Sequence, residues 1–185
     1  AVSGLSPRSR TPQFVPAASS LYQTSPFQVD NPPVLVGERT NANGSKLFRD
    51  LLAREEWEGI VAMGKEQVRE QAHMLDVCAA YVGRDERADM REIISRFNQQ
   101  ITVPLVIDST ESPVLEEALQ RIAGKAVVNS INLEDGEERL ERIVASLIDN
   151  NSKYLALAAE IGRLRKVVEQ QNGRASWFDR IRKWL

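Results

Sequence analysis

Four short apolar runs, each followed by a stretch with helical spacing, do most to restrict the folds open to this chain. The runs lie at 34–36, 74–75, 105–107 and 126–128, and each leads into polar residues. Short runs without polar alternation are typical of strands that are buried on both faces. Because strands separated by helices form right-handed crossovers onto a parallel sheet, the sequence predicts an α/β fold.

The stretches between these runs carry apolar residues three and four positions apart, as amphipathic helices do. The clearest example follows the third run, where Ser112 suits an N-cap, Pro113 the first helical position and Gly124 a stop. Its apolar positions are Val114, Leu115, Ala118, Leu119 and Ile122. These signals predict a helix after each strand.

Composition excludes several classes of protein. The chain has 185 residues, 42% of them apolar, which is enough for one packed domain, and its formal charge of −2 gives no reason to expect a nucleic-acid partner. A single cysteine, Cys78, excludes disulfides within the chain and favours a reducing compartment, so we expect a cytoplasmic location. No apolar run is long enough to span a membrane.

Composition also divides the chain into three parts. Residues 1–33 are rich in proline and serine, and we interpret them as a disordered linker. Their acid-poor, serine-rich start also resembles an organelle transit peptide, but the prolines disfavour the helix that such a peptide forms. Residues 34–149 contain the strand and helix pattern, and residues 150–185 are predicted to form a separate helical extension.

The extension has two features that bear on partners. Apolar residues recur at helical spacing over 154–168, which suits either a homodimer seam or docking onto the rest of the protein. Over 177–185, apolar and aromatic residues share one face beside basic residues, as in a short membrane anchor. We favour packing onto the protein for this last segment, because so short a helix holds a membrane weakly.

Each predicted strand ends in carboxylate or amide side chains. These exits carry Glu38 and Asn41, Asp76, Asp108 with Ser109 and Thr110, and Asn129 with Ser130. Parallel strands bring their carboxyl ends to one edge of the sheet, so these side chains should meet there, although each alone would also serve as a helix cap. Without a zinc cluster, a phosphate loop or a nucleophile and base pair, the set suits a flat heterocycle with donor and acceptor edges.

Four separated motifs point to a family. The segments VGERTNANGSKLFRDLL (36–52), AHMLDVCAAYVGRDERADM (72–90), VPLVIDST (103–110) and AVVNSINLEDGEER (126–139) resemble the pterin-binding folate domain of cobalamin-dependent methionine synthase. Corrinoid methyltransferases and, more remotely, dihydropteroate synthase are similar. The resemblance implies a methyltransferase with a (β/α)8 barrel that binds 5-methyltetrahydrofolate. It also implies partners: a cobalamin-binding module, to which the folate N5 methyl passes, and a homocysteine-binding module.

The resemblance also implies roles for particular residues. Glu38 and Asn41 would line the pterin pocket, with Asp76 from the second strand. Asp108 would pair with the pterin amino and ring nitrogen donors. Asn129 would lie near the ring, where its amide can follow a change of protonation at N5, so Asp108 and Asn129 are the predicted catalytic residues. No metal is implied in this module.

The chain departs from the family pattern in two ways. Cys78 stands where many relatives have asparagine, and we predict that this thiol packs in the interior. The resemblance stops near Ile143, after four strand and helix units, so the expectation is half a barrel. A second copy or another polypeptide would then complete the barrel, or the chain would be a non-catalytic interaction module. His73 is predicted to make local hydrogen bonds rather than to act as a base.

Overall fold

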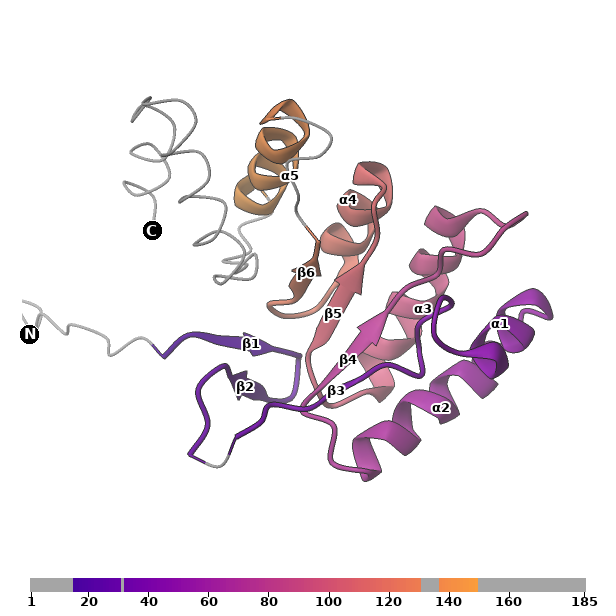
Figure 1. Cartoon of the computed structure of the whole chain (residues 1–185), viewed down its shortest axis with the longest axis horizontal. Helices are drawn as coiled ribbons and strands as arrows, with labels where there is room; N and C mark the ends of the chain where they lie inside the picture. Colours follow the sequence, from indigo (N-terminus) through magenta and orange to yellow (C-terminus); the bar gives the residue numbers. More distant parts are fainter. Residues whose placement is uncertain (1–14, 31, 131–136, 150–185) are drawn as a thin grey trace, which may run out of the picture.

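The predicted parallel sheet is present, and its strands follow chain order. A computed structural model describes residues 15–30, 32–130 and 137–149. In this part of the chain the main sheet has the order β3-β4-β5-β6, with parallel pairing throughout (Figure 1). The strands are β3 (Val36–Gly37), β4 (Met74–Val77), β5 (Leu105–Asp108) and β6 (Val127–Asn129). The α/β fold predicted from the sequence is confirmed.

Helices follow the strands as the apolar spacing predicts. They are α1 (Lys46–Ala53), α2 (Trp57–Arg69), α3 (Glu86–Gln100), α4 (Ser112–Arg121) and α5 (Glu137–Asp149). Two begin with side-chain caps, since Ser45 accepts from the Phe48 N–H and Asp85 from the Ala88 N–H. In α4 the cap position is Glu111, one residue earlier than predicted, and Ser112 lies in the first turn.

Alternation along the strands gives the sheet two different faces. One set of side chains packs into the main hydrophobic core with the helices, among them Leu75, Val77, Leu105, Ile107 and Val128. The alternate positions Met74, Val106 and Val127 lie in a second cluster on the opposite, inner face. Because alternation continues along each strand, the next inward positions are Asp76, Asp108 and Asn129. The core therefore fixes the direction in which these polar side chains point.

A β-hairpin covers the lower part of the inner face. Strands β1 (Ala17–Ser19) and β2 (Thr24–Pro26) pair antiparallel, and fully buried Ala18 packs in the inner cluster. This part of the structure corrects the prediction of a disordered linker over 1–33, of which 1–14 and 31 lie outside the described residues. Composition did not indicate the hairpin, because the sheet, and not the hairpin, supplies most of the apolar surface that becomes buried between them.

Gly124 allows the hairpin to approach the sheet. The backbones of Ser19 and Lys125 exchange hydrogen bonds of 2.8 Å in both directions. A Cβ atom on Gly124, where φ is +143°, would lie 2.3 Å from the Ser19 carbonyl oxygen. The glycine read as a helix stop therefore has a second task, because only a residue without a side chain fits this contact.

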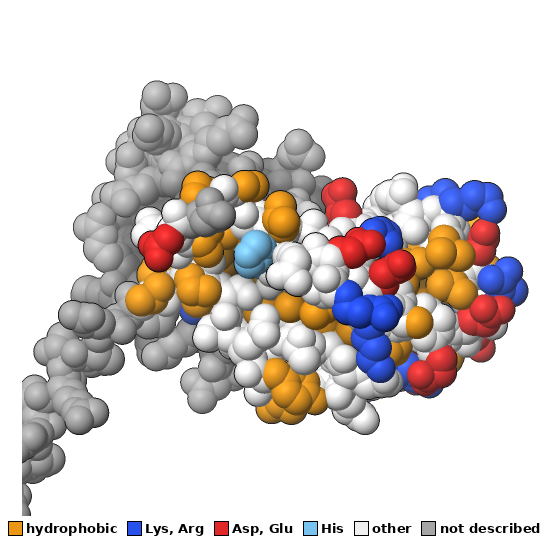
Figure 2. Space-filling model, turned by 90° about the horizontal axis from the view of Figure 1, so that it is seen from below, with side chains coloured by type: hydrophobic (Ala, Val, Ile, Leu, Met, Phe, Trp, Pro, Cys, Tyr) orange, Lys and Arg blue, Asp and Glu red, His pale blue; other side chains and the backbone are white. Residues whose placement is uncertain are grey.

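The sheet is open at β3, where a closed barrel would continue. Leu35 and Val36 remain 46% and 44% exposed along this edge. Figure 2 shows hydrophobic side chains over the hairpin and the adjoining sheet, and charged side chains of both signs towards α1 and α2. The arrangement is that of half a (β/α)8 barrel, because among the described residues β3 and β6 each pair with a main-sheet strand on one side only.

Three further predictions concern His73, membrane-spanning helices and the C-terminal extension. His73 makes the predicted local hydrogen bonds, because its Nδ1 accepts from the Leu35 N–H at 3.0 Å and its own N–H donates to the Leu35 carbonyl. Among the described residues, no helix is both long and apolar enough to cross a membrane. The predicted seam at 154–168 and the amphipathic end at 177–185 lie outside the described residues.

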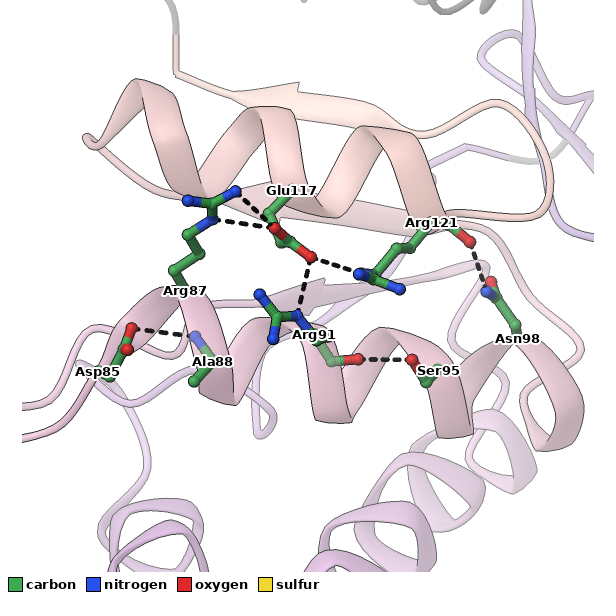
Figure 3. Close-up of polar contacts among 8 residues, drawn as sticks. All are labelled: Asp85, Arg87, Ala88, Arg91, Ser95, Asn98, Glu117 and Arg121. Carbon is green, nitrogen blue, oxygen red and sulfur yellow. Dashed lines mark hydrogen bonds and ion pairs between the residues drawn. The ribbon is translucent and has the colours of Figure 1, made fainter.

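A carboxylate buried between α3 and α4 holds these two helices together. The Glu117 side chain is 4% exposed and accepts from Arg87, Arg91 and Arg121 over distances of 2.5 to 2.9 Å (Figure 3). Hydrogen bonds from these guanidinium groups lower the pKa of Glu117 to about 2. Since two of the arginines lie on α3 and one on α4, the carboxylate acts as a clamp between neighbouring β/α units.

We expect Glu117→Gln to destabilise the protein by about 2 kcal/mol near pH 7, because charge-assisted hydrogen bonds are lost from a buried group. A carboxyl whose pKa is lowered on folding stabilises the protein above its unfolded pKa, and this stability is lost as pH falls. The difference from wild type should therefore shrink between about pH 4.5 and pH 2. Urea denaturation measures it. Glu116→Gln, one residue away on α4, is the control, and equal losses in both variants would contradict the clamp.

Candidate functional site

The centre of the candidate site is the amide of Asn41, which lies between two carboxylates. Its Nδ2 donates to Asp76 Oδ2 at 2.6 Å and to Asp108 Oδ2 at 2.9 Å. Its Oδ1 accepts from the Asn43 backbone N–H at 2.8 Å, so the nitrogen side of the amide faces the acids. Asn41 and Asp76 are only 6% and 4% exposed. Three strand exits, from β3, β4 and β5, are therefore joined through one side chain.

Burial makes both carboxylates harder to ionise. Desolvation raises the pKa of Asp76 to about 6, the Asn41 hydrogen bond opposes the rise, and the charges of Asp108 and Glu38 add to it. The pKa of Asp108 is also raised, chiefly by burial, and is held down by hydrogen bonds from Asn41 and Cys78. The two acids therefore lie in a site where added hydrogen-bond donors would be strongly favoured.

The remaining predicted residues lie at the same edge of the sheet. Asn129 is the direct partner of Asp108 in the β5–β6 register and is partly exposed, and its carbonyl accepts from the Ser109 N–H at 3.1 Å. Glu38 is exposed, and its charge raises the pKa of both Asp76 and Asp108. The structure thus brings all five predicted site residues to one polar edge, which we call the mouth: Glu38, Asn41, Asp76, Asp108 and Asn129.

Cys78 lies in the interior beside this mouth. It is 2% exposed, its sulfur accepts from Asn43 Nδ2 at 3.5 Å, and burial raises the pKa of its thiol to about 11. A thiol with so high a pKa stays protonated and is a poor nucleophile at neutral pH. This agrees with its predicted role in packing, and the thiol also helps to hold down the pKa of Asp108.

Sequence reasoning missed Glu86, which borders the mouth at the start of α3. Ser109 Oγ donates to Glu86 Oε1 at 2.7 Å, and burial raises the pKa of this carboxyl, which also lies near the charges of Glu111 and Asp108. In the sequence Glu86 follows the Asp85 cap and is read as an ordinary acid of a first helical turn. Only the tertiary structure shows its contact with the exit of β5.

The described residues contain no group of three or more His, Cys, Asp or Glu side chains arranged to hold a metal ion. The donor set of the mouth suits another kind of ligand. Its carboxylates accept paired N–H donors, and its amides both donate and accept, which matches the edge of a pteridine ring. The fold and this set of side chains define a parallel β/α half-barrel with a candidate binding site for a planar heterocycle.

Comparisons with known proteins give the family. A sequence profile described as "Pterin binding enzyme" matches residues 37–173, which is further along the chain than the resemblance near Ile143 indicated. Methionine synthase of Mycobacterium tuberculosis (strain ATCC 25618 / H37Rv) is 39% identical over 163 residues, and that of Mycobacterium leprae (strain TN) is 37% identical over 161 residues. The chain therefore belongs to the pterin-binding enzyme family.

The extent of these matches is informative. The two alignments cover 86% and 85% of this chain but only 14% and 13% of the methionine synthases, so the chain spans about one seventh of their length. The structure is similar to that of Xanthomonas albilineans dihydropteroate synthase in complex with indole-2-carboxylic acid and 6-chloroguanine, with a TM-score of 0.52 and 17% identity. That match covers 76% of this chain and 49% of the other. It shows the fold, and its coverage agrees with half a barrel.

We expect Asp76→Asn to stabilise the folded protein at pH 7, by on the order of 1 to 3 kcal/mol. A carboxyl whose pKa rises on folding weakens the folded state as pH increases from its unfolded value, 3.8, to its folded value, about 6. An asparagine oxygen can still accept from Asn41 but carries no charge. Urea denaturation at pH 3.5 and 7 measures the gain, which should vanish at the lower pH. A stability loss at pH 7, with Asp30→Asn as a neutral control, would contradict this account.

Proposed function

We propose that this chain is the pterin-binding module of a cobalamin-dependent methionine synthase. It would bind 5-methyltetrahydrofolate at the mouth and present the N5 methyl group to cob(I)alamin on another domain. The observation that carries the proposal is the Asn41 amide between Asp76 and Asp108, because these partly desolvated acids would gain most from a ligand with several N–H donors. Membership of the pterin-binding family supports the same ligand class.

Each residue would have a distinct task. Asp108 would accept hydrogen bonds from the pterin amino group and an adjacent ring N–H, in the paired geometry that a carboxylate favours. Asn41, which also donates to Asp76, would hold that carboxylate in place, and Glu38 would line the exposed side. Asn129 would face N5, since an amide can donate to a nitrogen lone pair or accept from a protonated nitrogen.

The chemistry requires that N5 become a leaving group. The N5–CH3 bond breaks with both electrons remaining on nitrogen, so hydrogen bonding or protonation at N5 stabilises the transition state. Cobalamin, when bound by its own module, supplies the nucleophile that takes the methyl group. In this chain the tasks are to bind the pterin, to orient it and to accommodate the change at N5.

The proposed reaction needs partner modules in addition to the described residues of this chain. The related methionine synthases are about seven times as long as the aligned segment, and we propose that cobalamin-binding and homocysteine-binding modules complete the cycle. We also propose a cytoplasmic location, which the single cysteine supports.

We expect the purified chain to bind 5-methyltetrahydrofolate, and Asp108→Asn or Asn129→Ala to weaken binding about ten- to a hundredfold, since a hydrogen bond to a charged group contributes roughly 1.5 to 3 kcal/mol. Isothermal titration calorimetry measures the affinities. Asp30→Asn, an exposed acid close to the hairpin, is the control and should bind as wild type does.

A different result would favour the non-catalytic alternative. If the folded chain does not bind the folate, and light scattering shows an oligomer that is lost when residues 150–185 are deleted, the pterin proposal is wrong. The chain would then be an interaction module assembled through its extension.

A further inference from the structure

The pairing between β3 and β4 contains one extra residue on the β3 side. Val36 pairs with Met74 and Gly37 with Leu75, and pairing then resumes between Asn41 and Cys78. Three residues therefore separate the pairs on the β3 side, whereas two separate them on β4. Residues 39 and 40 form a turn within this interval. We call the one-residue insertion the β3 bulge because, like a β-bulge, it bends the chain locally and redirects the side chain that follows.

The bulge decides which side chain reaches the mouth. Positions two apart on a strand share a face, so an uninterrupted strand would place Thr40, two residues after Glu38, on the inner side. With one residue inserted, Asn41 takes that place and contacts Asp76. The ladder closes again around it, since Ala42 N–H donates to the Cys78 carbonyl at 2.9 Å.

Two buried polar side chains hold the bulge. Gln67 on α2, which is 3% exposed, accepts from the Arg39 N–H through Oε1 at 2.8 Å and donates from Nε2 to Thr40 Oγ1 at 3.4 Å. Thr40, which is fully buried, donates in turn to the Asp76 carbonyl at 2.6 Å. A continuous chain of hydrogen bonds therefore runs from the helix layer, through the bulge, to the strand that carries Asp76.

Gly37 makes room for this arrangement. A Cβ atom at this position would lie 2.7 Å from Gln67 Oε1 and 3.0 Å from a methyl carbon of Leu75. The Gln67 amide can therefore lie against β3 at Gly37, where the strand has no side chain. The glycine, the glutamine and the threonine thus form one support for the segment 38–41.

We propose that Thr40 and Gln67 are positioning residues, which hold the β3 bulge so that the Asn41 amide is fixed between Asp76 and Asp108. Neither side chain would touch the ligand. The inference rests on the proposed function for its effect on pterin binding, whereas its effect on Asn41 can be measured without any ligand.

The first test measures ligand-free protein. In Thr40→Val, which keeps the shape of the side chain, the loosened Asn41 should donate less to Asp76, and the pKa of Asp76 should rise by about one unit. A ¹³C NMR titration measures this, with Asp76→Asn to assign the signal. The other ionisable groups that act on Asp76, namely Asp108 and Glu38, are unchanged in this variant.

Three further variants separate positioning from general stability. Thr40→Ser keeps the hydroxyl group and should keep the wild-type pKa of Asp76. Gln67→Met removes both amide contacts and should raise that pKa as Thr40→Val does. Ser25→Ala is the matched control, because the Ser25 hydroxyl is also buried and donates to the His73 carbonyl just before β4, at 2.8 Å. It should leave the pKa of Asp76 unchanged.

The second test measures 5-methyltetrahydrofolate binding, which should weaken about tenfold in Thr40→Val and Gln67→Met but not in Thr40→Ser or Ser25→Ala. An unchanged Asp76 pKa in folded Thr40→Val, or an equal change in Ser25→Ala, would overturn the positioning role. Failure of wild type to bind the folate would overturn the proposed function alone, since the NMR titration does not depend on it.

Discussion

The contact on which the mouth depends is the pair of hydrogen bonds from Asn41 to Asp76 and Asp108. Two carboxyl groups that approach each other away from water repel when both are charged, and burial raises the pKa of each. The amide reduces this penalty but offers only two N–H groups for two acids. Additional hydrogen-bond donors would lower this cost, because hydrogen bonds favour the charged form of each carboxyl.

The rest of the fold keeps these groups in place from the opposite side of the sheet. Leu75, Val77 and Ile107 anchor the strands in the helix-side core, so that the alternate positions must face inward. The Glu117 clamp joins α3 to α4 without involving the mouth. The inner face, by contrast, contains Asp76, whose raised pKa means that its charged form opposes folding at neutral pH.

Much of this fold could be predicted because its signals are local. Short apolar runs and helical spacing identified β4, β5 and β6 and the helices between them. The hairpin could not be predicted from composition, because Ala18 is buried only when the far-separated Val106 and Val127 come to meet it. The Glu117 clamp was equally hidden, since its arginines at 87, 91 and 121 look like ordinary exposed charges in the sequence.

The orientation of Asn41 in the mouth could not be predicted from local patterns either. Strand exits indicated the residues of the mouth, but counting by twos from Glu38 selects Thr40 rather than Asn41 for the inner face. The family resemblance indicated Asn41 as a site residue, but it did not explain why the Asn41 side chain faces inward. The explanation lies in a register that gains one residue between Gly37 and Asn41, and in a glutamine 26 positions beyond Asn41. Because the bulge depends on a contact between distant segments, no local pattern can predict it, and the helix layer takes part in shaping the ligand site.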